Sequence, residues 1–174
     1  MMQKKVQIIS DGSLDLSQEL TKEKDIEVVP FYVSFDSETY QKEMVEVGVR
    51  EFYQEMVDHP TVFPKTSMPS VHDYYEVFEK HAKEKMPVIC ICITRKFSGS
   101  LQSATTAKDM ILEEYQDAQI TVIDSTVNTV LQGLYVLEAC RLRDMGLEYQ
   151  QIVDALLPIR ETGRIFFTIG SIDY

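Results

Sequence analysis

The sequence predicts an α/β fold, a doubly wound and mainly parallel sheet with helices on both faces. Short apolar runs alternate with segments of helical periodicity through the whole chain, which is the order that a parallel sheet requires. Residues 87–93 form a continuous apolar run, so we expect a central strand with both faces covered. The length of 174 residues suits one domain, and the sequence contains no internal repeat or linker.

The first half of the chain is expected to begin with two strands and a helix. A short apolar run at 6–9 predicts the first strand, which a polar turn closes. A second extended run at 26–35 is interrupted at Pro30, which favours an edge position or a bend. Residues 49–58 place their apolar side chains on one helix face, and Pro60 ends that helix.

The second half begins with an irregular loop at 65–70 that leads into a helix. Ser70 and Asp73 form the S-x-x-D capping signature at the start of this helix. Beyond the strand at 87–93, we expect a loop at 94–99, a helix at 100–115, a strand at 120–123, a helix from about 128 to 145, a further helix from 147 and a final strand at 165–169. Gly146 suits the residue that follows a helix C-terminus.

The charge balance argues against a nucleic-acid partner. Lys and Arg number 17 against 28 Asp and Glu, a net charge of −11, whereas nucleic-acid-binding proteins carry a basic surface. The sequence has no apolar run of about 18 residues and no signal-peptide core, so we expect a cytoplasmic protein without a transmembrane segment. The three cysteines are expected to be buried, reduced thiols, with Cys90 and Cys92 on one face of a strand.

Hydroxyl side chains concentrate in four loops that follow strands or precede helices. In a parallel sheet, ligands bind at the carboxyl ends of the strands, and hydroxyls with free N–H groups at helix N-termini can hold an anion. These loops are Ser10–Ser13, Thr66–Ser70, Phe97–Ser100 and Asp124–Thr126. Each residue can also be a helix cap and nothing more, so a shared ligand site and a set of separate caps both remain open.

Other site chemistries lack their motifs. Neither a dinucleotide nor a P-loop glycine pattern occurs, and no G-x-S-x-G elbow surrounds Ser98. The only histidines are His59, His72 and His81, and the last two lie on opposite faces of one helix. We therefore expect no metal and no cofactor.

Five motifs in order resemble those of the DegV family of bacterial fatty-acid-binding proteins. The first is Asp11-Gly12-Ser13, where the family has an Asp-Ser-Thr type of turn. Residues 65–70 resemble its T-S-x-P-S motif, and residues 97–104 resemble its S-G-T-x-x-S-A motif. The other two are Val28-Val29-Pro30 and Val122-Ile123-Asp124-Ser125. Gly12 and Ser100 depart from the family pattern, since they stand where it has a hydroxyl residue and a threonine.

The resemblance implies a protein that binds one long-chain fatty acid and has no catalytic activity of its own. Thr66 and Ser98 would hold the carboxylate. The supporting loop residues would be Asp11, Gly12, Ser13, Ser67, Gly99, Ser100, Asp124 and Ser125. Some family members present the bound acid to a separate kinase, so a fatty-acid kinase subunit is a possible partner. We expect Asp11 and Asp124 to accept backbone N–H bonds and to bind no metal.

The resemblance also implies a domain organisation. Residues 1–174 correspond to the family's N-terminal domain, whereas a C-terminal domain that covers the acyl chain begins near a G-G-R-I motif beyond residue 174. The 174 residues alone are therefore expected to leave much of the tail in water. Two alternatives remain: a dihydroxyacetone or sugar kinase-like α/β domain, with Asp11 and Asp124 as Mg²⁺ ligands, and an interaction module with an empty cleft.

Overall fold

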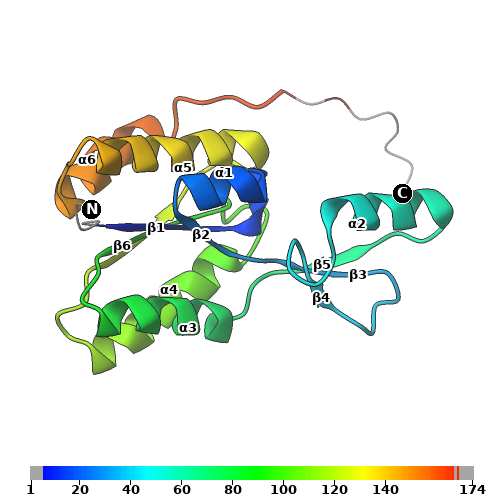
Figure 1. The fold of residues 1–174 in the computed structure, drawn as a ribbon, viewed down its shortest axis with the longest axis horizontal. Helices are drawn as coiled ribbons and strands as arrows, with labels where there is room; N and C mark the ends of the chain where they lie inside the picture. The colour runs from blue at the N-terminus through cyan, green and yellow to red at the C-terminus, as the bar shows by residue number, and fades with distance from the viewer. Residues whose placement is uncertain (1–5, 167, 169–174) are drawn as a thin grey trace.

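A four-stranded parallel sheet forms the centre of the protein. The computed structural model describes residues 6–166 and residue 168. The strand order is β2-β1-β6-β7, and all neighbours are parallel (Figure 1). The strands are β1 (Gln7–Asp11), β2 (Ile26–Val29), β6 (Val88–Cys92) and β7 (Ile120–Asp124). The predicted fold class is confirmed.

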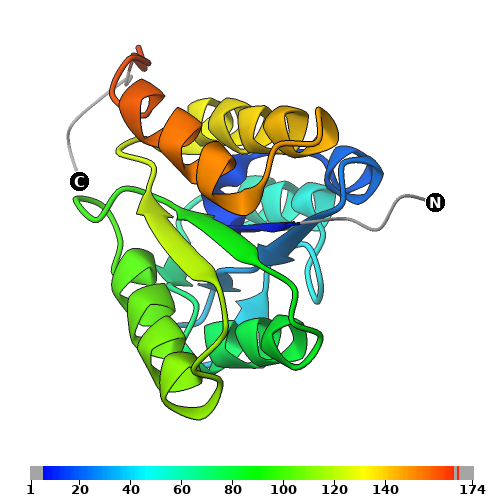
Figure 2. The ribbon, with the colours of Figure 1, turned by 90° about the vertical axis from the view of Figure 1, so that its left-hand side faces the viewer.

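Helices cover both faces of this sheet (Figure 2). One face carries α5 (Thr129–Asp144) and α6 (Tyr149–Ile159), with α1 (Gln18–Glu23) beside α5, and the other carries α3 (Val71–Lys83) and α4 (Ser100–Glu114). Along β6, Ile89 and Ile91 pack in the core under α5 and α6, whereas Cys90 and Cys92 pack against α3 and α4. The prediction of a central strand with both faces covered is confirmed, as is the burial of the free cysteines.

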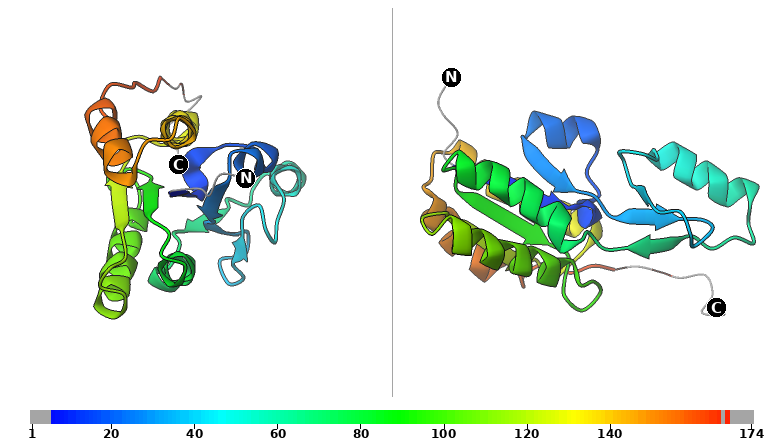
Figure 3. Two further views of the ribbon diagram at one scale, coloured as in Figure 1. Left: turned by 60° about the vertical axis from the view of Figure 1, so that its left-hand side comes forward. Right: turned by 90° about the horizontal axis from the view of Figure 1, so that it is seen from below.

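A second, antiparallel sheet lies at one end of the first (Figures 1 and 3). It consists of β3 (Tyr32–Ser34), β4 (Gln41–Lys42) and β5 (Lys65–Ser67) in the order β4-β3-β5, together with α2 (Val49–Asp58). The chain enters it through Pro30, directly after β2, which is an edge strand of the main sheet. Of the two alternatives expected for Pro30, the edge position is confirmed, because Pro30 directly follows the edge strand β2.

Two expected elements differ from the structure. Residues 65–67 were expected in a loop, but they form β5 because Tyr32 to Ser34 of β3 supply the backbone partners. The final strand expected at 165–169 is wrong where the structure describes it. Ile165, Phe166 and Thr168 belong to no strand, and Phe166 is 93% exposed because no neighbouring strand pairs with this segment. Residues 167 and 169 lie outside the described residues.

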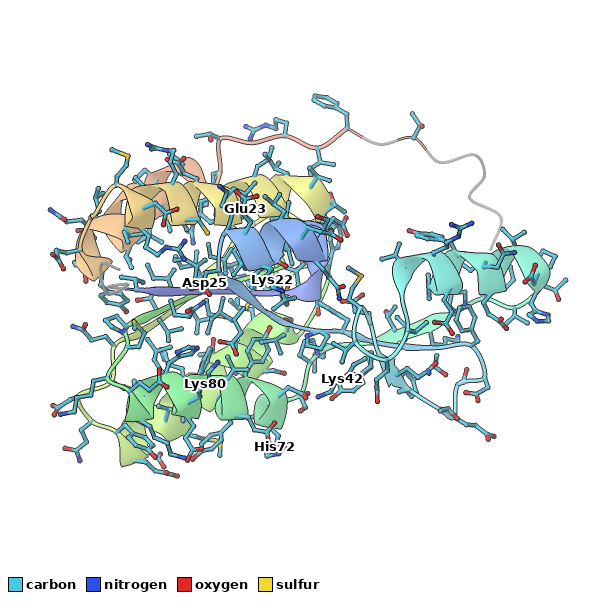
Figure 4. The ribbon with its side chains drawn as sticks, in the orientation of Figure 1. Lys22, Glu23, Asp25, Lys42, His72 and Lys80 are labelled. Carbon is cyan, nitrogen blue, oxygen red and sulfur yellow. The ribbon has the colours of Figure 1, made fainter. Side chains whose placement is uncertain are left out.

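Asp73 joins the second sheet to the main body. Its carboxylate accepts hydrogen bonds from the backbone N–H (2.8 Å) and hydroxyl (2.6 Å) of Ser70, which completes the predicted capping box. It also accepts one from the Tyr32 hydroxyl (2.8 Å) of β3 and pairs with Lys42 Nζ (3.1 Å) of β4. Figure 4 labels Lys42 at this junction.

Among the helices of the described residues, none is long and apolar enough to cross a membrane.

Candidate functional site

A buried carboxylate lies where β1 ends. Asp11 is fully buried, and its Oδ2 atom accepts hydrogen bonds from the Ile93 N–H (2.9 Å) and the Ser100 hydroxyl (2.7 Å). Its Oδ1 atom accepts from Gln132 Nε2 (2.8 Å) and the Ser13 hydroxyl (3.0 Å). Burial raises the pKa of Asp11, although these hydrogen bonds act to lower it. One side chain thus ties the ends of β1 and β6 to the starts of α4 and α5.

Ser100 links this carboxylate to the loop that contains Ser98. The Ser100 hydroxyl lies 2.6 Å from the Tyr74 hydroxyl of α3, and its backbone N–H donates to Ser98 Oγ at 3.2 Å. Ser98 is half-buried, and Gly99 is the N-cap of α4. A serine oxygen has two lone pairs and one hydrogen, so this bond leaves the Ser98 hydrogen for an acceptor outside the loop.

Thr66 lies on β5 of the second sheet. It was expected in the loop that leads into α3, but it pairs with Val33 of β3 and its side chain is exposed. Ser67 is also exposed and pairs with Tyr32. Because successive strand residues point to opposite faces, Thr66 and Ser67 present their hydroxyls to different sides of the sheet.

The segment that follows Thr66 lies against the Ser98 loop. A Cβ atom built on Gly99 would lie only 2.5 Å from Met68 Sδ, so glycine is what allows this close approach. Three of the four hydroxyl loops are therefore neighbours: Asp11 connects the first to the third, and Met68 connects the second to the third.

A cavity of about 880 Å³ opens between α1, β2, the second sheet and α2. Its volume falls within the range of small-molecule sites, roughly 300–1,000 Å³. Apolar side chains on its wall include Leu16, Ile26, Val28, Val33, Val47 and Phe52. Of the expected site residues, Gly12 and Thr66 lie on this wall, whereas Ser98 is not among the lining residues.

Three acidic residues, Asp15, Glu19 and Glu43, belong to the same wall. Glu43 Oε1 accepts a hydrogen bond from the Phe31 N–H at 3.0 Å. A Cβ atom at Gly12 would lie 1.8 Å from this oxygen, so the glycine makes room for Glu43 in its present position. Burial raises the pKa of Glu43, and the nearby charges of Asp11 and Asp15 raise it further.

The fourth hydroxyl loop makes its hydrogen bonds within itself, to β6 and to the residue that follows α6. Asp124 Oδ1 accepts a hydrogen bond from the Thr126 N–H (2.8 Å). The buried Ser125 hydroxyl donates to Val127 O (2.9 Å), and the Ser125 N–H donates to Cys92 O (3.0 Å). Neither Asp124 nor Ser125 lines the cavity.

Within the described part of the chain, no group of three His, Cys, Asp or Glu side chains could hold a metal ion.

Sequence reasoning missed Tyr74, Gln132 and Glu43. Tyr74 and Gln132 are both fully buried, and their helical positions indicate only that they face the core. The single available signal was Gln132, a polar residue in a helix that is apolar on more than one face. Nothing in the sequence marks Glu43, whose place on the cavity wall follows from the second sheet.

Comparison with known proteins identifies the family. The family model described as "Uncharacterised protein, DegV family" matches residues 5–174. The chain belongs to the DegV family. A DegV domain-containing protein of Clostridium acetobutylicum is 33% identical over 153 residues, which cover 88% of this chain and 53% of that protein. This chain thus spans about half the length of the curated DegV relatives that it matches.

Solved DegV-type structures share the fold. A stearic acid-binding protein from Eubacterium ventriosum is 46% identical with a TM-score of 0.83, over 87% of this chain and 52% of that one. A DegV family protein from Thermus thermophilus, whose structure is described as showing fatty-acid binding, is 28% identical with a TM-score of 0.75. That match covers 90% of this chain and 53% of the other.

Proposed function

We propose that this chain binds a long-chain fatty acid, with the carboxylate held by the hydroxyls of Thr66 and Ser98. The observation that carries the proposal is an apolar cavity with Thr66 on its wall, beside the segment that packs on the Ser98 loop. Its best support from relatives is the 46% identical stearic acid-binding protein. Since Ser98 Oγ already accepts the Ser100 N–H, its hydrogen is free to be donated to a carboxylate.

The net charge of −11 is compatible with an anionic ligand. Hydroxyl and backbone N–H donors carry no charge of their own, and the first turn of α4 adds the positive end of the helix dipole. A local set of such donors can therefore hold a carboxylate on an acidic protein.

The acyl tail would enter the cavity. Burying each CH₂ group contributes roughly 0.8 kcal/mol, so the tail supplies most of the affinity. The matched segment is little more than half of each DegV relative, and we propose that the additional part of such proteins covers the outer end of the tail. As part of the same proposal, the chain is a cytoplasmic carrier without catalytic activity that presents the acid to a separate kinase.

Calorimetric titration of palmitate into single variants tests the head-group assignment. Thr66→Val and Ser98→Ala each remove a hydroxyl donor to a charged acceptor, a loss of roughly 1–3 kcal/mol. Each change should therefore raise the Kd about 5- to 150-fold. Thr61→Val is the matched control, because Thr61 is exposed and lies outside both the cavity wall and the four hydroxyl loops. Unchanged affinity in both Thr66→Val and Ser98→Ala would remove the assignment.

A further inference from the structure

We infer that Tyr74 and Gln132 are positioning residues that fix the direction in which the Ser98 hydroxyl donates. They act through Asp11 and Ser100, and neither of them touches the ligand. The inference rests on the proposed role of Ser98. Its own observation is the buried chain of hydrogen bonds that runs from α3 and α5 to the loop before α4.

The first step is the state of Asp11. Each of its oxygens receives one bond from an N–H donor, from Ile93 on Oδ2 and from Gln132 on Oδ1. Oδ2 also accepts the Ser100 hydroxyl, and the single hydrogen of the Ser13 hydroxyl is shared between Asp11 Oδ1 (3.0 Å) and Gln132 Oε1 (2.6 Å), so polar hydrogens face both oxygens of an ionised carboxylate. An ionised Asp11 can only accept, and this sets the direction of every bond around it.

The second step is the direction of the Tyr74 bond. A serine hydroxyl has one hydrogen, and Ser100 gives it to Asp11 Oδ2 at 2.7 Å. The Tyr74 hydroxyl, 2.6 Å from Ser100 Oγ, must therefore be the donor in that pair. Tyr74 is fully buried in α3, so its bond ties Ser100 to α3 in addition to the bond with Asp11.

The third step concerns Gln132, whose amide has one orientation in this network. Its Nε2 atom donates to Asp11 Oδ1 (2.8 Å) and Ser10 Oγ (3.1 Å), and its Oε1 atom accepts the Ser13 hydroxyl (2.6 Å). The reverse orientation would place the amide oxygen against the carboxylate of Asp11. Gln132 therefore holds Asp11 in the rotamer that reaches Ser100.

The last step connects Ser100 to Ser98. With its side chain held by Asp11 and Tyr74, the backbone N–H of Ser100 has a fixed direction and donates to Ser98 Oγ at 3.2 Å. This bond occupies one lone pair of Ser98 and leaves the hydrogen to point away from the helix start. If the hydrogen bonds of Tyr74 or Gln132 are lost, Ser98 remains in the protein, but its O–H bond is held less firmly in the direction of the ligand carboxylate.

Palmitate titration of Tyr74→Phe and Gln132→Met tests the inference. Each variant should raise the Kd about threefold to tenfold, because the lost bond acts on the ligand only through Asp11 and Ser100. Tyr135→Phe is the matched control, because its buried hydroxyl donates to Leu156 O (2.8 Å) and joins α5 to α6. We expect its Kd within about twofold of the parent's, although its melting temperature should fall as it does in Tyr74→Phe.

A double-mutant cycle with Ser98→Ala separates positioning from a general loss of stability. In the Ser98→Ala protein, Tyr74→Phe should change the Kd less than about twofold, because there is no hydroxyl left to aim. An equal effect of Tyr74→Phe with and without Ser98 would overturn the inference, as would an unchanged Kd in both Tyr74→Phe and Gln132→Met. If Ser98→Ala and Thr66→Val both leave the Kd unchanged, it is the proposed function that fails.

Discussion

Replacing Asp73 with asparagine should destabilise the protein in a pH-dependent way. Burial acts to raise the pKa of this carboxyl, but the hydrogen bonds from Ser70, Tyr32 and Lys42 outweigh it and lower the pKa to about 2. The charged form is therefore the one that holds β3 and β4 to the start of α3. Asparagine keeps the size of the side chain but removes the charge and places an amide donor among these donors.

The magnitude follows from the pKa. A shift from 3.8 to about 2 corresponds to roughly 2.4 kcal/mol at about 1.36 kcal/mol per pKa unit. The Lys42 side chain is 37% exposed, so solvent screens part of this energy, and we expect a loss of about 1–2 kcal/mol at pH 7. Since the folded-state pKa lies below the unfolded one, this stabilisation is complete above about pH 4 and disappears as the pH falls towards 2.

Urea unfolding of the parent and of Asp73→Asn, at pH values from 7 down to 3, measures the effect. The free-energy difference should be largest at pH 7 and should begin to shrink below about pH 4. Asp154→Asn is the control, because Asp154 is exposed and accepts a hydrogen bond from Gln150 on the same helix. A difference that stays constant over this pH range, or none at pH 7, would refute the reasoning.

Three further predictions concern metal, packing and charge. Thermal melts with Mg²⁺ and with a chelator should coincide, because Asp11 and Asp124 accept hydrogen bonds; a reproducible Mg²⁺-dependent stabilisation would support the sugar kinase-like alternative. Gly133→Ala should lower the free energy of unfolding by about 1–3 kcal/mol, because the new Cβ atom would lie 2.4 Å from the Leu14 backbone carbonyl oxygen. Gly48→Ala should lower it by less than about 1 kcal/mol, because a Cβ atom there would have no neighbour within 4 Å. Equal melting temperatures for these two variants would contradict that close approach. Glu43→Gln should lower the palmitate Kd about two- to fivefold at pH 8, because it removes a negative charge that repels the fatty-acid carboxylate. The gain in affinity should become smaller as the pH falls towards the raised pKa of Glu43. An unchanged Kd would mean that the bound carboxylate lies far from Glu43.

Local patterns were enough to predict the main sheet and its helices. The continuous apolar run that forms β6 indicates a buried central strand, and Ser70 with Asp73 marks the start of α3. The second sheet was not predictable in the same way. Its strands have two or three residues each, and Lys65 to Ser67 are exposed and polar, so only their pairing with β3 makes them a strand.

The same distinction applies to the candidate site: local patterns predict its loops, whereas its contacts depend on tertiary packing. The hydroxyl loops are visible in the sequence because their residues follow strand and helix signals. The assignment of Thr66 and Ser98 comes from the family resemblance, and their role stays a prediction. The contacts of Tyr74 and Gln132 depend on how α3 and α5 pack on the sheet, which helical periodicity does not encode. The cavity likewise depends on where the second sheet lies.

The central claim is that this chain binds a long-chain fatty acid. Native mass spectrometry of the purified 174-residue chain, before and after incubation with palmitate, tests it most directly, because it identifies what the protein carries. The account predicts a mass increment of a single long-chain fatty acid per chain. Thr66→Val and Ser98→Ala should lower the fraction of chains that carry this increment. A chain that retains an adenine nucleotide or a phosphosugar, or that takes up no fatty acid after incubation, would contradict the account.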